Sequence, residues 1–229
     1  MGKILVLVAH PDDEIIGVGG TLINHIDKGD KVRVIFLADG KSSRDSYNDK
    51  DLIVSKKENE RVAKFIGYEY KRIDLKDNQL DRYPLLEIVK IIENEVLEFE
   101  PSIIYTHSLQ DINIDHQICT LATITAIRPI EKFRCVSDII FFETLSETEW
   151  GPSERFEKFI PNVFQELSKD VLKRKMVALS LYESEMKEML HPRSLNIIEK
   201  NCEIWGSKVG LQYCEPLQIF RSIRRAYEI

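Results

Sequence analysis

Two short clusters of histidine and aspartate residues have the side chains best suited to chemistry in this sequence. The first, at residues 10–14, is His-Pro-Asp-Asp-Glu and directly follows an apolar run at residues 4–9. The second follows the apolar run at residues 103–105 and contains His107, Asp111, Asn113, Asp115 and His116. Imidazole and carboxylate groups are common ligands of first-row metal ions, and zinc is the usual choice. Together the two clusters predict a metal site.

The apolar runs before these clusters predict buried strands that position them. Strand patterns occur at residues 4–9, 31–38, 68–75, 103–106 and 137–143, and they alternate with helical patterns at 14–28, 51–65, 84–99, 115–127 and 168–189. This alternation predicts an α/β fold, a Rossmann-like three-layer sandwich with a mostly parallel sheet. Ligands of such sheets bind at the carboxyl ends of the strands, where both clusters lie. From about residue 190 we expect an extension that packs near the site, within one domain of residues 1–229.

Composition and charge exclude several classes of function. The chain has 229 residues, of which 43% are hydrophobic and 31% charged, as is typical of soluble globular proteins. Its net charge of −6 argues against nucleic-acid binding. The longest apolar runs are too short for a membrane-spanning helix or for the core of a signal peptide. We therefore expect a cytoplasmic protein with no nucleic-acid partner and no integral membrane segment.

Several residues outside the first cluster have two interpretations. His107 is either a substrate-binding residue or a hydrogen-bonded histidine at a strand end, and Arg44 either binds phosphate or sugar hydroxyls or is a solvated loop arginine. The group at residues 191–194 is a helix stop or part of a substrate rim. Tyr182 and Glu185 are expected on a helix as surface or packing residues. The glycines at 17, 19 and 20 lack the dinucleotide-loop spacing, so they indicate close helix packing.

The quoted motifs resemble those of the LmbE-like, or PIG-L, family of zinc-dependent de-N-acetylases. That family includes the N-acetylglucosaminyl-phosphatidylinositol deacetylases and the deacetylases of mycothiol and bacillithiol synthesis. The resemblance rests on the His-Pro-Asp-Asp-Glu string and the later Asp115-His116 pair. It extends to further residues, namely Asp39-Gly40, Gly67, Asp77-Asn78, Ser194, Gly206 and Gly210.

The resemblance implies a role for each matching residue. His10, Asp13 and His116 would bind Zn²⁺ and leave a position open for water, although Fe²⁺ suits the same ligands. Asp12 would be the general base, and Asp115 would accept a hydrogen bond from an active-site imidazole. Glu14 opens a helix, where the helix dipole favours a carboxylate, so its role is taken as structural.

The second cluster departs from the family pattern at one position. Familiar members carry a histidine that is thought to stabilise the tetrahedral intermediate, and here that position is Asn113. Asparagine can donate a hydrogen bond to an oxyanion but cannot titrate, so Asn113 is expected to support the oxyanion. The acid role then falls on Asp12 or on another group such as His107. Asp111 is assigned to substrate binding together with Arg44 and His107.

The expected function is removal of an N-acetyl group from a small amino-sugar derivative in glycan or sugar-conjugate biosynthesis. The stretches at 111–116, 128–129 and 143–150 resemble a branch associated with bacterial surface glycans. A thiol-sugar, nucleotide-linked or lipid-linked substrate is an alternative. The substitution at Asn113 also allows a carbohydrate-binding member without activity. Family members are often oligomers, so a homo-oligomer is consistent with the resemblance.

Overall fold

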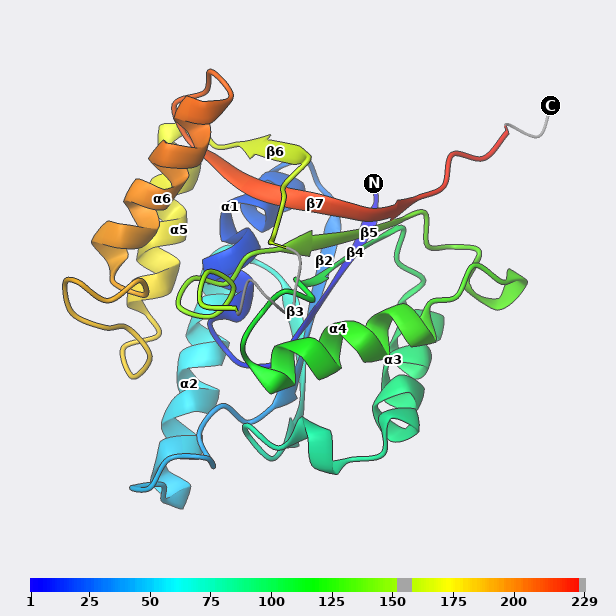
Figure 1. Ribbon diagram of the computed structural model, residues 1–229, viewed down its shortest axis with the longest axis horizontal. Coiled ribbons are helices and arrows are strands. Elements are labelled where there is room, and N and C mark those ends of the chain that lie inside the picture. The colour runs from blue at the N-terminus through cyan, green and yellow to red at the C-terminus, as the bar shows by residue number, and fades with distance from the viewer. Residues whose placement is uncertain (152–157, 227–229) are drawn as a thin grey trace.

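The computed structural model describes residues 1–151 and 158–226 (Figure 1). Within these residues, seven strands form one sheet in the order β3-β2-β1-β4-β5-β7-β6. Five of them are parallel: β1 (Lys3–Val8), β2 (Lys31–Ala38), β3 (Glu69–Leu75), β4 (Ile103–His107) and β5 (Asp138–Phe142). The other two, β6 (Val163–Glu166) and β7 (Cys214–Ser222), are antiparallel to their neighbours. The predicted mostly parallel sheet is confirmed.

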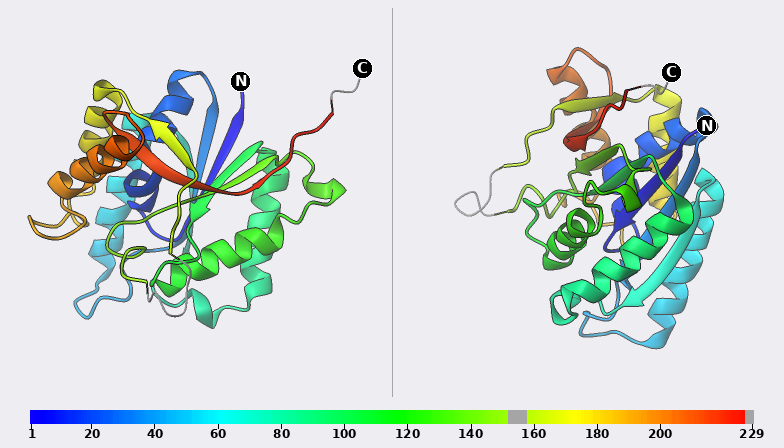
Figure 2. Two further views of the ribbon diagram at one scale, coloured as in Figure 1. Left: turned by 45° about the horizontal axis from the view of Figure 1, so that its top comes forward. Right: turned by 90° about the vertical axis from the view of Figure 1, so that its right-hand side faces the viewer.

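Helices cover both faces of the sheet (Figures 1 and 2). One apolar core lies under α1 (Asp13–Asp27), α2 (Asp49–Ile66), α5 (Lys169–Ser180) and α6 (Leu195–Lys208). The other lies under α3 (Leu85–Phe99) and α4 (Ile114–Ala126), with the 3₁₀ turns η1 (Leu80–Arg82) and η2 (Glu131–Phe133) beside them. Strand β1 supplies Val6 and Val8 to the first core and Leu5 and Leu7 to the second. Because successive strand residues point to opposite faces, a strand buried on both sides is apolar throughout.

The C-terminal part of the fold differs from the sequence-based expectation. The helix predicted over residues 168–189 ends at Ser180, and the chain then turns so that the Tyr182 hydroxyl donates to Glu14 Oε1 at 2.7 Å. The segment after residue 190, which was expected as an extension near the site, forms α6 and then β7, which lies between β5 and β6 (Figure 2, left). The sheet thus contains strands from both ends of the chain.

The glycines of α1 allow the helix to pack closely on the sheet, as the sequence indicates. A Cβ on Gly17 would lie 2.1 Å from Phe142 Cδ2, and a Cβ on Gly20 would lie 2.5 Å from Leu167 Cδ2. Any larger side chain would push α1 away from β5. In the part of the chain that the structure describes, no helix is both long and apolar enough to cross a membrane.

Candidate metal centre and active site

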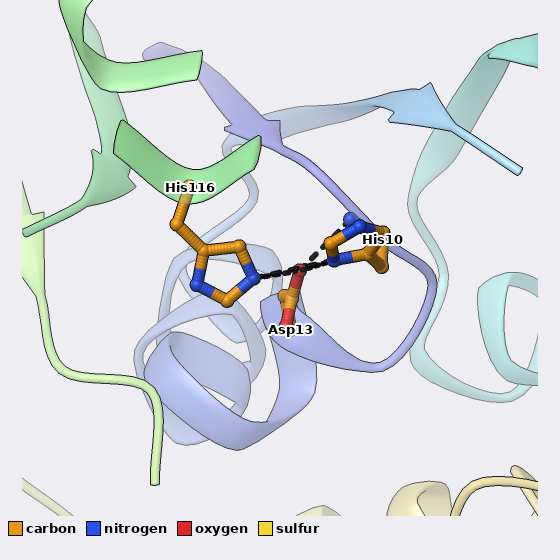
Figure 3. A group of neighbouring side chains, drawn as sticks. All are labelled: His10, Asp13 and His116. Atoms are coloured by element: carbon orange, nitrogen blue, oxygen red, sulfur yellow. Dashed lines mark hydrogen bonds and ion pairs between the residues drawn. The ribbon is translucent and has the colours of Figure 1, made fainter. Parts of the chain in front are cut away.

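Three predicted ligands converge at the carboxyl end of the sheet (Figure 3). His10 follows β1, Asp13 is the first residue of α1, and His116 lies in the first turn of α4. The His10 Nδ1 to His116 Nε2 distance is 3.2 Å. Asp13 Oδ2 lies 3.4 Å from His10 Nδ1 and 3.3 Å from His116 Nε2. Four donors around a tetrahedral zinc ion, each about 2.0–2.1 Å away, are separated by about 3.3 Å, so these spacings fit that ion.

The outward nitrogen of each imidazole is held by a carboxylate. His10 Nε2 lies 3.1 Å from Asp115 Oδ2 and 3.1 Å from Asp77 Oδ1. His116 Nδ1 lies 3.0 Å from Asp111 Oδ2. A proton on each outward nitrogen satisfies these contacts and leaves the inward nitrogens as lone pairs, the arrangement typical of metal-binding histidines.

The buried carboxylate of Asp13 supports the same conclusion. Its Oδ1 atom has no hydrogen-bond partner among the described residues, although the side chain is buried. A buried carboxylate oxygen without a donor is costly, and a cation held by the Asp13 carboxylate as a whole would offset that cost. The donor set of two imidazoles and one carboxylate is that of catalytic zinc sites, so the residues fit a divalent ion.

Electrostatics at the centre favour positive charge. Burial lowers the pKa of His10, but hydrogen bonds to three carboxylates outweigh burial and hold this pKa well above its usual value; they are Asp115, Asp13 and Asp77. Burial also opposes protonation of His116, yet nearby carboxylates raise its pKa to about 10. The cluster therefore has an excess of negative charge, which would attract a divalent ion as it attracts protons.

Asp12 lies beside the three converging residues but is separate from them. It adopts a left-handed backbone with φ 104°, and its carbonyl accepts the first hydrogen bonds of α1, from the amides of Ile15 and Ile16. Its own amide donates to Glu14 Oε2 at 3.1 Å. Burial raises the pKa of the Asp12 carboxyl, and the charge of Arg193 opposes this rise. Asp12 is thus a buried carboxylate that lies beside the three converging residues and is not one of them.

A polar pocket of about 180 Å³ opens over this centre. Most of its walls are charged or hydrogen-bonding groups from loops that follow the strands and from the chain after α5. They are His10, Pro11, Asp12, Gly40, Ser43, Arg44, Asp77, Asn113, Glu147, Glu185 and Arg193. Such walls suit a hydroxyl-rich ligand better than an apolar one.

Asn113 and Arg44 both line the pocket. Asn113 is the N-cap of α4, and its Oδ1 accepts from the Asp115 amide at 2.9 Å, so its Nδ2 is the group that can donate into the pocket. Arg44 Nη2 donates to Glu185 Oε2 at 2.6 Å, and Lys41 Nζ contacts the other oxygen of the same carboxylate. Glu185 is therefore a pocket residue rather than a helix surface residue, because the chain has left α5 before it.

The structure places His107 and Asp111 outside the pocket lining. His107 is fully buried, and its ring stacks on that of His116 with centroids 3.8 Å apart. Its Nε2 accepts from the Ala9 amide at 3.0 Å and its Nδ1 lies 3.1 Å from Thr144 Oγ1. Both ring nitrogens are thus occupied by the protein itself. Asp111 is also buried, with Oδ2 3.0 Å from His116 Nδ1, so both residues contact His116 and neither lines the pocket.

Sequence reasoning assigned no role in the site to Glu147, and Arg193 entered it only as part of a group that could form a substrate rim. Arg193 Nη2 donates to Glu147 Oε1 at 2.9 Å, and Nη1 lies 3.5 Å from Asp12 Oδ2. Asp77 was part of the family resemblance but had no assigned role. The sequence signal for Asp77 is the polar pair Asp77-Asn78 just after a predicted strand, because polar residues at strand ends often line a site.

Comparisons with known proteins identify a family model that covers both clusters. The family model described as PIG-L, GlcNAc-PI de-N-acetylase, matches residues 5–127, which is more than half of the chain. That range includes both histidine and aspartate clusters. No curated protein sequence matches the chain.

Solved structures with the same fold have several functions. N,N'-diacetylchitobiose deacetylase from Pyrococcus horikoshii is 19% identical, with a TM-score of 0.77 over 96% of this chain and 84% of that one. Teicoplanin deacetylase Orf2, in a zinc-inhibited form, is 16% identical, with a TM-score of 0.75 over 97% of this chain and 100% of that one. GalB, the 4-carboxy-2-hydroxymuconate hydratase from Pseudomonas putida KT2440, is 19% identical, with a TM-score of 0.77 over 100% of this chain and 99% of that one. At these identities the likeness shows the fold alone.

Proposed function

Because this chain belongs to the PIG-L family of GlcNAc-PI de-N-acetylases, we propose that it is a metal-dependent hydrolase that removes an N-acetyl group from an amino-sugar derivative. The observation that carries the proposal is the convergence of His10, Asp13 and His116 around one point, with the Asp12 carboxylate beside it. We propose Zn²⁺ as the ion, and Fe²⁺ suits the same ligands.

The residues of the pocket have distinct roles in this proposal. A divalent ion bound by His10, Asp13 and His116 would polarise the amide carbonyl and make water more acidic. Asp12 accepts the proton of the attacking water and then delivers a proton to the departing amine. Asn113 Nδ2 donates a hydrogen bond to the carbonyl oxygen as it gains negative charge.

The surrounding carboxylates hold this arrangement in place. Asp115 and Asp77 orient His10, and Asp111 orients His116, through the contacts described above. The polar wall formed by Arg44 and Glu185 is proposed to bind sugar hydroxyls. The chitobiose and teicoplanin deacetylases with this fold support an amide on a sugar or sugar conjugate as the substrate.

The first test measures bound metal and product together. Elemental analysis of the wild type should give about one zinc or iron per chain, and His116→Ala should lose it. His25→Ala is the matched control, since His25 contacts Asp30 and Tyr105 away from the site. Amine and acetate released from N-acetylglucosamine and N,N'-diacetylchitobiose are then quantified.

The outcomes separate the parts of the proposal. Metal lost only in His116→Ala, with equal amounts of amine and acetate released by the wild type, supports both the site and the reaction. Metal binding without release from these sugars or from thiol-, nucleotide- or lipid-linked N-acetyl sugars would overturn deacetylation. Hydration would then be the reaction to test next, because a hydratase has this fold and hydration also requires activated water. A wild type that binds no metal under chelator-free conditions would overturn the metal site.

A further inference from the structure

The pocket contains two arginines in different environments. Arg44 has 39% of its side chain exposed, and its guanidinium donates to Glu185 at the pocket wall. Arg193 has only 15% of its side chain exposed. It lies in the segment between α5 and α6, far in sequence from the residues of the metal centre. Both arginines line the pocket, but Arg44 is the more exposed of the two, whereas most of the Arg193 side chain is buried.

The guanidinium of Arg193 is held on three sides. Its Nε donates to Ser146 Oγ at 2.7 Å, and its Nη2 donates to Glu147 Oε1 at 2.9 Å. The remaining Nη1 faces Asp12 Oδ2 at 3.5 Å. The Arg193 amide also donates to His191 Nδ1 at 3.1 Å, which fixes the backbone behind the side chain. The guanidinium is planar and rigid, so its two anchors determine where Nη1 points.

Asp12 depends on this contact for its orientation. The terminal torsion of an aspartate side chain is broad, so a carboxylate without a partner samples many directions. Among the described residues, Arg193 is the side chain that contacts the Asp12 carboxylate by a hydrogen bond or an ion pair. The backbone of Asp12 is already fixed in the left-handed region by the start of α1.

We infer that Arg193 is a positioning residue, which holds the Asp12 carboxylate in the direction from which it accepts the proton of the attacking water. This inference rests on the proposed function. It differs from a substrate-binding role, because Arg193 acts through Asp12 and not through the sugar. A misdirected base slows the chemical step, whereas a lost substrate contact weakens binding.

The kinetic test compares Arg193→Gln and Arg193→Lys with the wild type. We expect kcat to fall about 10- to 100-fold in Arg193→Gln, with KM within about threefold and metal content unchanged. Arg193→Lys keeps the charge but not the planar fork, so it should recover only part of the loss. Arg61→Gln is the matched control, since Arg61 pairs with the exposed Glu183 at the surface. A raised KM with unchanged kcat, full activity in either variant, or an equal loss in the control would overturn the inference.

A structural test does not depend on activity. Crystal structures of the wild type and Arg193→Gln should show the Asp12 carboxylate turned to a new direction in the variant, and an unmoved carboxylate would overturn the inference. If Arg193→Gln does not fold, Ser146→Ala can be used in its place, because it removes one hydrogen bond that holds the guanidinium. The Asp12 carboxylate should then turn in the same way but by a smaller amount. A wild type that releases no amine would overturn the proposed function alone, because these structures would still decide whether Arg193 orients Asp12.

Discussion

Helix α1 connects two buried groups of charged residues that differ in how completely they are hydrogen-bonded. At its N-terminus, His10 Nδ1, His116 Nε2 and Asp13 Oδ2 converge, and Asp13 Oδ1 has no hydrogen-bond partner among the described residues. In its middle, Lys175 and Glu215 form a buried ion pair at 2.7 Å. Both groups are largely buried, although His10 at the N-terminus also lines the pocket, so burial alone does not distinguish a functional site from a structural one.

The Lys175–Glu215 pair forms hydrogen bonds with backbone groups of α1 where the helix is interrupted. Val18 has non-helical angles, φ −133° and ψ 16°, which leaves backbone groups of α1 without helical partners. Lys175 Nζ donates to the Ile16 carbonyl at 2.9 Å, and Glu215 accepts from the amides of Gly20 and Thr21 at 2.8 and 2.7 Å.

The two groups differ in where their buried charges find partners. In the middle of α1, each charged group meets groups of the opposite character from the protein itself. At the N-terminus, lone pairs face one another, and their charge is balanced only by a proton or a cation. We therefore expect changes at the N-terminus to affect metal binding and catalysis, and changes at the pair to affect folding.

The largest effect is expected from Asp12→Asn. Asparagine keeps the shape of the side chain but cannot accept the proton of water, so kcat should fall about 10²- to 10⁴-fold. Metal content and thermal stability should stay close to the wild type, because Asp12 is not one of the converging ligands. Amine release and elemental analysis measure both quantities. Asp27→Asn, at a surface pair with Arg174, is the control. A fully active Asp12→Asn protein would refute the proposed base.

Lys175→Met tests the other half of the comparison. Removing the ammonium leaves the Glu215 carboxylate buried without its counter-ion, which should destabilise the fold by about 3–5 kcal/mol. Urea denaturation measures this loss, and kcat at a temperature where the variant is folded should equal that of the wild type. Adding Glu215→Gln should restore part of the stability. A stable Lys175→Met protein with impaired catalysis would show that the Lys175–Glu215 pair serves catalysis and not folding.

Glu14 lies between the two groups and provides a pH test. Tyr182 and Tyr68 donate to its Oε1, yet burial raises the pKa of Glu14 from 4.5 to about 7. A raised carboxyl pKa favours the protonated folded state. The stabilisation is complete below pH 4.5 and is lost as the pH rises through 7, a change on the order of 3 kcal/mol.

Glu14→Gln removes that titration. The free energy of unfolding of the wild type, minus that of Glu14→Gln, should decrease between pH 4.5 and 7 in metal-free buffer. Urea denaturation at several pH values measures the difference. The exposed Glu183→Gln should show no such change. Parallel pH profiles for the wild type and Glu14→Gln would contradict the raised pKa.

The sequence predicted the parts of the molecule that depend on short segments. The strands β1 to β5 and the positions of His10, Asp13 and His116 follow from apolar runs that end in polar residues, because parallel strands bring their carboxyl ends together. The family resemblance then suggested which of the clustered residues bind metal.

The remainder depends on contacts between distant segments. The helical period continues past Ser180, but the chain turns there because Tyr182 reaches Glu14 and Ser184 reaches Glu58. Strand β7 contains Glu215 and Pro216, and a charged residue followed by proline is not typical of a buried strand, so the sequence does not predict it. Arg193 contacts Asp12 although the two residues are 181 positions apart in the sequence. Local patterns do not encode such contacts.

Asp111→Asn is expected to give the smallest effect, because it weakens a single hydrogen bond to a predicted metal ligand. Asp111 Oδ2 holds His116 Nδ1 at 3.0 Å and also accepts from Thr148 Oγ1 at 3.1 Å. An amide accepts these bonds more weakly, so His116 becomes a poorer ligand and metal affinity should fall about 10- to 100-fold. Competition with a chromogenic chelator measures the Kd, with Asp27→Asn as the control. Because Asp111 lies outside the pocket lining, the KM of the metal-saturated variant should be unchanged. A raised KM would instead indicate that Asp111 binds substrate.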